Sequence, residues 1–300
     1  MNFQLKKGDC IGILSPSRPL GKYKKEVLKG IQELKTMGFR VKCAANWDKK
    51  YYYESGTVNE KLADIYELFS DQDVKAIICS IGGSSSNKLL DKIDYDLIRI
   101  NKKILIGYSD NTSLLLACQY KAKIKTFHGP DVYEFSRISS EARKFFRKCF
   151  SSKNKVIRYP KTMSVWREGK AKGKLFGGNL TLINSLLGSN YIKAKKGSIL
   201  FWEEIGESPA MIDFKLHEMR LKGLFNQING MIVGKLTDCQ DKKYPEDDRP
   251  IKDILLEATQ KYNFPIVKVD WFGHEVNDFY IMPLDCNASL DTYKKKINVN

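Results

Sequence analysis

Short apolar runs alternate with amphipathic stretches through the first half of the chain, and this alternation constrains the fold more than any other feature. An apolar run from Cys10 to Leu14 is followed by apolar residues at three- and four-residue spacing from Tyr23 to Met37. This pattern predicts a strand and then a helix that ends at Gly38. Further strands are predicted at 39–45, 74–81 and 103–107, each followed by a helix. The repeated order predicts an α/β fold with a mostly parallel, Rossmann-like sheet and flanking helices.

The second half of the chain is richer in short strand-like runs and predicts a second, smaller, β-rich α/β domain. These runs lie at 174–176, 198–202, 230–236, 266–271 and 279–282, with helical patterns near 179–188, 209–223 and 250–261. The polar, lysine-rich stretch between the two halves is typical of a linker. We therefore expect an N-terminal domain over 1–150, a linker over 151–173 and a C-terminal domain over 174–300.

Composition excludes several classes of protein. The 300 residues are 42% hydrophobic, which is enough for a core, but no apolar run reaches the roughly 18 residues of a membrane span. The N-terminus lacks an apolar signal segment, so we expect no membrane partner and a cytoplasmic location. The seven cysteines form no Cys-x-x-Cys pair and the three histidines lie far apart. We therefore expect no disulfide framework, no metal site and no cofactor.

The formal net charge of +16 is the feature that favours another class, because basic chains bind nucleic acid or anionic surfaces. The lysines are spread along the chain, and the longest clusters, at 193–196 and 294–296, are short. No nucleic-acid motif or aromatic platform accompanies them, so we do not expect a nucleic-acid partner. The charge remains able to attract anionic substrates.

Ser109 lies at a predicted strand-to-helix turn. The apolar run that ends at Gly107 is followed by Tyr108-Ser-Asp-Asn-Thr112 and then by an apolar helical pattern. A serine on such a turn presents its hydroxyl at a helix N-terminus, where backbone N–H groups can face a developing oxyanion. The same residue types are good helix caps, so Ser109 is either a nucleophile or an N-cap.

A serine nucleophile needs a base, and the three histidines differ as candidates. His217 lies in a predicted helix that begins with Ser208 as its cap and Pro209 at its first position. Its neighbours are charged, which indicates a solvent-facing side chain. His128 follows a short predicted strand and either lines the cleft of Ser109 or closes a turn. His274 lies in a Gly-His loop after an apolar stretch and is either a base or an ordinary loop histidine.

Four ordered blocks of sequence resemble the LD-carboxypeptidase family of serine peptidases, which includes muramoyltetrapeptide carboxypeptidases and microcin C immunity peptidases. The resemblance spans residues 5 to 290. The blocks are 79–94; 106–110 with 126–130; 177–180 with 199–207; and 271–274 with 281–283.

The resemblance implies that Ser109 is the nucleophile, Glu203 the orienting carboxylate and His274 the general base, with the two domains bringing them together. Glu203 and Glu204 are neighbours on a predicted strand, so only one of them can meet His274. By the same resemblance, backbone N–H groups of Gly83 and Asp110 form the oxyanion hole. The residues expected to line the substrate site are Gly82, Ser84, His128 and Trp166.

The family's two branches leave the substrate open. One branch removes D-alanine from the LD bond of a muropeptide, and the other cleaves an aminoacyl nucleotide of the microcin C type. Residues 80–87 and 106–110 are closer to the immunity branch, whereas Glu207 stands where that branch has a lysine. Trp166 is either that branch's stacking tryptophan or a packing residue. The resemblance also implies a homodimer, and the alternative function is a non-catalytic basic binding protein that holds an acidic peptide or nucleic acid.

Overall fold

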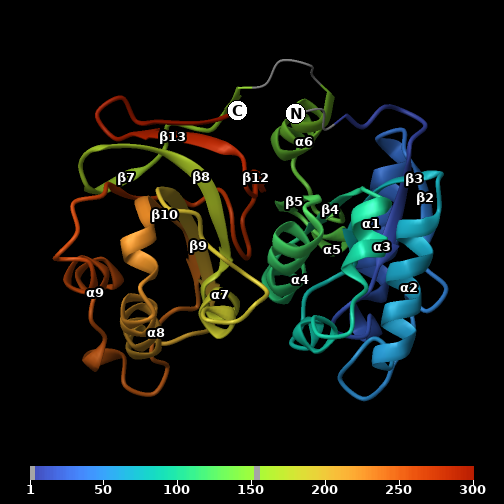
Figure 1. The fold of residues 1–300 in the computed structure, drawn as a ribbon, viewed down its shortest axis with the longest axis horizontal. Coiled ribbons are helices and arrows are strands. Elements are labelled where there is room, and N and C mark those ends of the chain that lie inside the picture. Colours follow the sequence, from blue (N-terminus) through green and yellow to red (C-terminus); the bar gives the residue numbers. More distant parts are fainter. Residues whose placement is uncertain (1–3, 152–155) are drawn as a thin grey trace. The chain divides into compact units, whose positions relative to one another are not determined.

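The chain forms two units, and each unit is built around one β-sheet (Figure 1). The computed structural model describes residues 4–151 and 156–300. Unit 1 comprises residues 1–154 and 277–284, and unit 2 comprises residues 155–276 and 285–300. The chain therefore passes from one unit to the other three times.

Unit 1 contains a six-stranded sheet in the order β12-β5-β4-β3-β1-β2. The strands are β1 (Cys10–Leu14), β2 (Arg40–Cys43), β3 (Val74–Cys79), β4 (Ile104–Gly107), β5 (Lys125–His128) and β12 (Met282–Pro283). All neighbours are parallel except β12, which runs antiparallel to β5. The strand order reverses between β1 and β3, and open parallel sheets bind ligands at the carboxyl ends of strands beside such a reversal. The predicted parallel sheet is confirmed.

Six α-helices flank this sheet in the described part of unit 1 (Figure 1). They are α1 (Lys24–Thr36), α2 (Val58–Ser70), α3 (Tyr95–Ile100), α4 (Thr112–Ala117), α5 (Val132–Phe135) and α6 (Ser140–Ser151). Helix α2 begins at a capping box, in which Thr57 and Glu60 satisfy each other's backbone N–H groups. Isoleucines such as Ile11 and Ile77 are fully buried in the central strands, as expected for a sheet covered on both faces.

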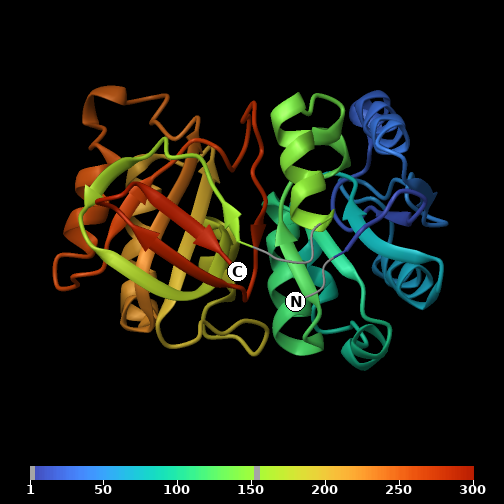
Figure 2. The same cartoon turned by 90° about the horizontal axis from the view of Figure 1, so that it is seen from above.

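Unit 2 contains an eight-stranded sheet in the order β6-β14-β13-β8-β9-β10-β11-β7. Its strands are β6 (Ile157–Arg158), β7 (Ser164–Arg167), β8 (Lys170–Asn179), β9 (Ser198–Ile205), β10 (Ile228–Thr237), β11 (Ile266–Lys268), β13 (Asn287–Asp291) and β14 (Lys296–Val299). Strands β8 to β11 are parallel, the outer pairs are antiparallel, and Figure 2 shows how this sheet curls. The helices are α7 (Leu180–Leu186), α8 (Pro209–Leu221) and α9 (Ile251–Ala258).

The stretch expected to be a linker differs from the expectation. Residues 152–155 lie outside the described residues, but β6, β7 and the first part of β8 fall within 157–173. Strands β6 and β7 end the sheet on either side, and edge strands carry exposed charged residues, so their sequence resembles a linker. The run expected as a strand of the second domain at 279–282 yields only β12, which pairs in unit 1.

In the part of the chain that the structure describes, no helix has both the length and the apolar character that crossing a bilayer requires.

Candidate active site

Ser109 occupies a strained turn at the carboxyl end of β4. It begins a 3-10 turn, Ser109–Asn111, that leads into α4. Its φ of 59° lies in the left-handed region, which residues other than glycine adopt rarely and mostly where the surroundings hold them. The side chain is half-buried. The N-cap of α4 is Asn111, so Ser109 is not the cap that the alternative interpretation expected.

Two glycines after β3 bring a second turn against Ser109. A Cβ atom added to Gly82 would lie 3.0 Å from Ser109 Oγ, and one added to Gly83 would lie 2.3 Å from Ser17 Oγ. Any side chain at either position would therefore displace a neighbour. Ser84 follows them and is exposed. Gly82, Gly83 and Ser109 lie together at the carboxyl edge of the sheet in unit 1.

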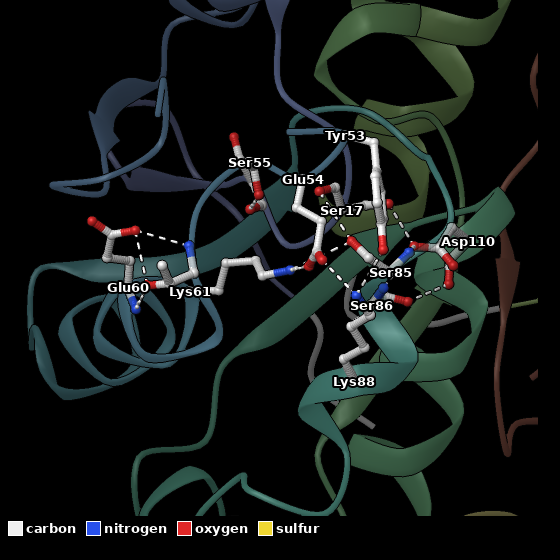
Figure 3. A network of polar contacts seen from close by, with 12 residues as sticks. Ser17, Tyr53, Glu54, Ser55, Glu60, Lys61, Ser85, Ser86, Lys88 and Asp110 are labelled. Carbon is white, nitrogen blue, oxygen red and sulfur yellow. Dashed lines mark hydrogen bonds and ion pairs between the residues drawn. The ribbon is translucent and has the colours of Figure 1, made fainter. Parts of the chain in front are cut away.

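The carboxylate of Asp110 holds the neighbouring loops together, and Figure 3 shows it beside Ser17, Ser85 and Ser86. Its Oδ2 accepts hydrogen bonds from Ser17 Oγ (2.5 Å), Ser85 N (3.0 Å) and Ser86 N (2.8 Å). The carbonyl oxygen of Asp110 accepts another from Ser86 Oγ (2.6 Å). The family resemblance implies a role only for the backbone N–H of Asp110. Its buried side chain ties the loops after β1 and β3 to the turn that carries Ser109.

In unit 2, Glu203 and His274 form a direct contact. Glu203 lies near the end of β9 with its side chain fully buried, and His274 lies in the loop after β11 with 12% of its side chain exposed. The distance from His274 Nδ1 to Glu203 Oε2 is 2.6 Å. A buried carboxylate on Nδ1 orients the imidazole and stabilises its protonated form, which leaves Nε2 for proton transfer.

Two features of unit 2 hold the loop of His274 against Glu203. Thr237, at the end of β10, donates a hydrogen bond from Oγ1 to the carbonyl oxygen of His274 (2.9 Å). Gly273 has a φ of 119°, and an added Cβ would lie 3.0 Å from Glu203 Cβ and 3.2 Å from the carbonyl oxygen of Lys235. Only glycine allows so close an approach at this backbone conformation.

Glu204 faces the other side of β9 and has a different partner set. Its two carboxylate oxygens accept hydrogen bonds from Asn179 Nδ2, from Thr181 N and Oγ1, and from Ile205 N. Burial, followed by the charge of Glu203, raises the pKa of Glu204 despite these bonds. Glu204 therefore joins the start of α7 to β9 and does not contact His274. Successive side chains on a strand point to opposite faces of the sheet, so the sequence already indicated that Glu203 and Glu204 point in opposite directions.

The remaining candidates lie on three other elements, and His128 is paired with Gly107 at the same edge of the sheet as Ser109. His128 is fully buried at the end of β5, where it packs on the rings of Tyr108 and Phe279. Trp166 is half-buried on the edge strand β7 of unit 2. His217 is half-exposed on α8, and its Nδ1 lies 2.8 Å from Asp213 Oδ1.

Glu207 has a partner within unit 2. Its Oε1 lies 2.7 Å from Nζ of Lys215, a buried lysine on α8. Among the residues that the structure describes, no three histidine, cysteine or acidic side chains are grouped so that they could hold a metal ion.

Two family models match the chain, one over the segment with Ser109 and the other over the segment with Glu203 and His274. The model of the LD-carboxypeptidase N-terminal domain matches residues 11–129, which include Ser109, and that of the C-terminal domain matches residues 172–290, which include Glu203 and His274. The chain belongs to the LD-carboxypeptidase family. It is accordingly a hydrolase of the carboxypeptidase type.

The chain is similar to relatives with names of more than one kind. It is 29% identical over 306 residues to a probable murein peptide carboxypeptidase of Bacillus subtilis, covering 97% of this chain and 91% of that one. It is 29% identical over 326 residues to the microcin C7 self-immunity protein MccF of Escherichia coli, covering 97% and 93%. A solved structure of MccF in complex with aspartyl sulfamoyl adenosine is similar at a TM-score of 0.91 and 27% identity, covering 100% of this chain and 98% of that one.

Proposed function

We propose that the chain is a cofactor-independent serine carboxypeptidase that uses Ser109, His274 and Glu203. The observation that carries this proposal is the 2.6 Å contact between His274 Nδ1 and a fully buried Glu203 carboxylate. A buried carboxylate that orients a partly exposed histidine is the arrangement a general base requires. The strained backbone of Ser109 and its place at a strand end supply the matching nucleophile.

In the proposed reaction, Ser109 Oγ attacks the carbonyl carbon of the scissile bond while His274 Nε2 takes the hydroxyl proton. The carbonyl oxygen gains the negative charge and accepts hydrogen bonds from the backbone N–H groups of Gly83 and Asp110. When the intermediate collapses, the C–N bond breaks, and the imidazolium gives its proton to the leaving nitrogen. A water molecule then attacks the acyl-enzyme ester by the same route and restores Ser109. Removing one oxyanion donor costs a hydrolase about 100- to 1,000-fold in rate.

The substrate is proposed as one of two compounds, each suggested by a relative. One is a muropeptide with an LD bond before D-alanine, and the other is an aminoacyl nucleotide of the microcin C type. Glu207, paired with Lys215, gives its position a carboxylate instead of the lysine that the immunity branch carries there. This position favours the muropeptide, whereas residues 80–87 and 106–110 are closer to the immunity branch and favour the aminoacyl nucleotide. The experiment therefore includes both compounds.

The test is mass-spectrometric detection of hydrolysis of a muramyl tetrapeptide ending in D-alanine and of aspartyl sulfamoyl adenosine. Wild type is compared with Ser109→Ala, His274→Ala and the matched control His217→Ala. We expect cleavage of one substrate by wild type and by His217→Ala, and none by the other two variants. Cleavage that survives in Ser109→Ala would refute the mechanism. If wild type cleaves neither compound and reacts with no serine-directed fluorophosphonate, the non-catalytic binding function replaces this proposal.

We also propose that the chain forms a homodimer, as the family resemblance implies. Light scattering on a size-exclusion column separates a dimer from the 34.4 kDa monomer. A mass that stays at the monomer value at all accessible concentrations would contradict this assembly.

A further inference from the structure

An ion pair of unit 1 is buried next to Ser85, in the loop after β3, and takes no part in the proposed chemistry. Lys61, on α2, and Glu54, in the preceding loop, have side chains 2% and 8% exposed, and Lys61 Nζ lies 2.6 Å from Glu54 Oε2. The second oxygen of Glu54 accepts a hydrogen bond from Lys88 Nζ, whose side chain is 42% exposed. Figure 3 shows these side chains meeting next to the loop after β3.

Two routes connect this pair to the loops around Ser109. In the first, Lys61 Nζ donates to Ser85 Oγ (3.4 Å), and Ser85 N donates to Asp110 Oδ2. In the second, Ser55, which follows Glu54, donates its backbone N–H to the carbonyl oxygen of Ser17 (2.9 Å).

Both routes end on residues that belong to the proposed oxyanion hole or lie next to it. Ser85 Oγ also donates to the carbonyl oxygen of Ser17 (3.2 Å), so the two routes share one acceptor. Ser17 Oγ is the atom that a side chain at Gly83 would strike, and Asp110 directly follows Ser109.

A buried ion pair is a poor way to gain stability, because removing two charges from water costs about as much as their attraction returns. Apolar residues of similar volume often fill such a place without loss. A gain in stability is therefore a weak explanation for the pair of Lys61 and Glu54, whereas its contacts to the loops around Ser109 point to a geometric role.

We propose that Lys61 and Glu54 are positioning residues that hold the turn of Gly82 and Gly83 in register with Ser109. They act through Ser85 and through the loop of Ser17, and neither touches the reacting atoms. The proposal rests on the proposed function for its catalytic consequence, but the fixed geometry that it describes can be measured without any turnover.

The first experiment is amide hydrogen exchange on wild type, Lys61→Met and Lys103→Met. Lys103 is the matched control, because it is also buried in unit 1 but stands just before β4, at the end of that strand opposite to Ser109. Its Nζ donates to the carbonyl oxygens of Asp71 and of Val74, the first residue of β3. In Lys61→Met we expect the amides of Ser85 and Ser86 to exchange at least about tenfold faster, while those of β4 stay unchanged. Unchanged exchange at Ser85 and Ser86 would overturn the proposal, whatever the enzyme's activity.

The second experiment separates positioning from stability. The variant Glu54→Met/Lys61→Met replaces the pair by apolar side chains and should recover the melting temperature that Lys61→Met loses. We expect its phosphonylation by a fluorophosphonate to be about 100-fold slower than that of wild type, because misplacement by about 1 Å costs that much. The loss should fall on the limiting rate constant of inactivation and not on the probe concentration that gives half of it. Recovery of both the melting temperature and the wild-type exchange at Ser85 would refute a positioning role.

These outcomes distinguish the two proposals. If wild type and Ser109→Ala are equally unreactive while exchange at Ser85 and Ser86 still responds to Lys61→Met, the serine mechanism fails and the positioning role stands. If wild type is active but Lys61→Met matches Lys103→Met in exchange and in kcat, the positioning role fails and the mechanism stands.

Discussion

Substitution of Gly273 by alanine tests how tightly the loop of His274 must approach Glu203. An alanine at a φ of 119° strains the backbone by about 1 to 3 kcal/mol. Its Cβ would also lie 3.0 Å from Glu203 Cβ and 3.3 Å from Glu203 Oε2, and overpacking of this kind costs about 1 to 3 kcal/mol more. We expect the free energy of unfolding to fall by about 2 to 6 kcal/mol in total. Each kcal/mol lost lowers the melting temperature by about 2 to 4 °C.

The matched control is Gly188→Ala, also in unit 2. Gly188 has a φ of 92°, and no atom lies within 4 Å of its added Cβ, so this variant carries the backbone strain without the contact. The difference between the two variants isolates the contact with Glu203. Thermal unfolding and turnover are measured on both, and we expect activity to fall about 100-fold only in Gly273→Ala, because the contact displaces Glu203 and His274. Equal melting temperatures and equal activities would refute this account of Gly273.

Three further outcomes are expected. Thr237→Val removes the hydrogen bond to the carbonyl oxygen of His274, which costs about 0.5 to 1.5 kcal/mol of unfolding free energy. We expect kcat to fall as well. A variant with unchanged kcat would show that this bond does not position the loop. Glu204→Leu leaves the buried amide of Asn179 without its acceptor, which costs about 1 to 3 kcal/mol, so the melting temperature falls. An unchanged melting temperature would refute the structural role. Burial raises the pKa of Glu54, but hydrogen bonds from Lys61 and other lysine contacts outweigh it, so the net pKa is lowered from 4.5. A carboxyl group with a lowered pKa stabilises the folded state above pH 4.5, and this contribution disappears as the pH falls through the folded pKa. We therefore expect the free energy of unfolding of wild type to fall more steeply with decreasing pH than that of Glu54→Gln. Parallel curves for the two proteins would contradict this expectation.

The parallel sheet of unit 1 could be predicted from the sequence because its strands and helices are patterned locally. Apolar runs such as β3 and amphipathic stretches such as α1 carry their own periodicity, and their order fixes the sheet type. The short strands β6 and β7 could not be predicted, because edge strands with polar faces lack that pattern. Strand β12 pairs only two residues with a strand about 150 positions earlier, and no local signal encodes such a pairing.

The candidate site divides in the same way. The turn of Ser109 is visible in sequence, because a strand, a turn and a helix follow one another there. The roles given to Ser109, Glu203 and His274 stay predictions. The burial of Lys61 depends on tertiary packing, although it stands four positions before Ile65 on the buried face of α2, and this spacing was a usable signal.

The return of residues 277–284 to unit 1 has a consequence for how the protein is made. Strand β12 covers the outer edge of β5, but it is synthesised after nearly all of unit 2. While the chain is still growing, the sheet of unit 1 therefore ends in an open strand edge, and such edges pair readily with foreign chains. The ribosome must finish the segment that carries His274 before unit 1 can close its own sheet. A nascent chain that stops short of Met282 should be aggregation-prone, even though all the residues of the Ser109 turn are already present.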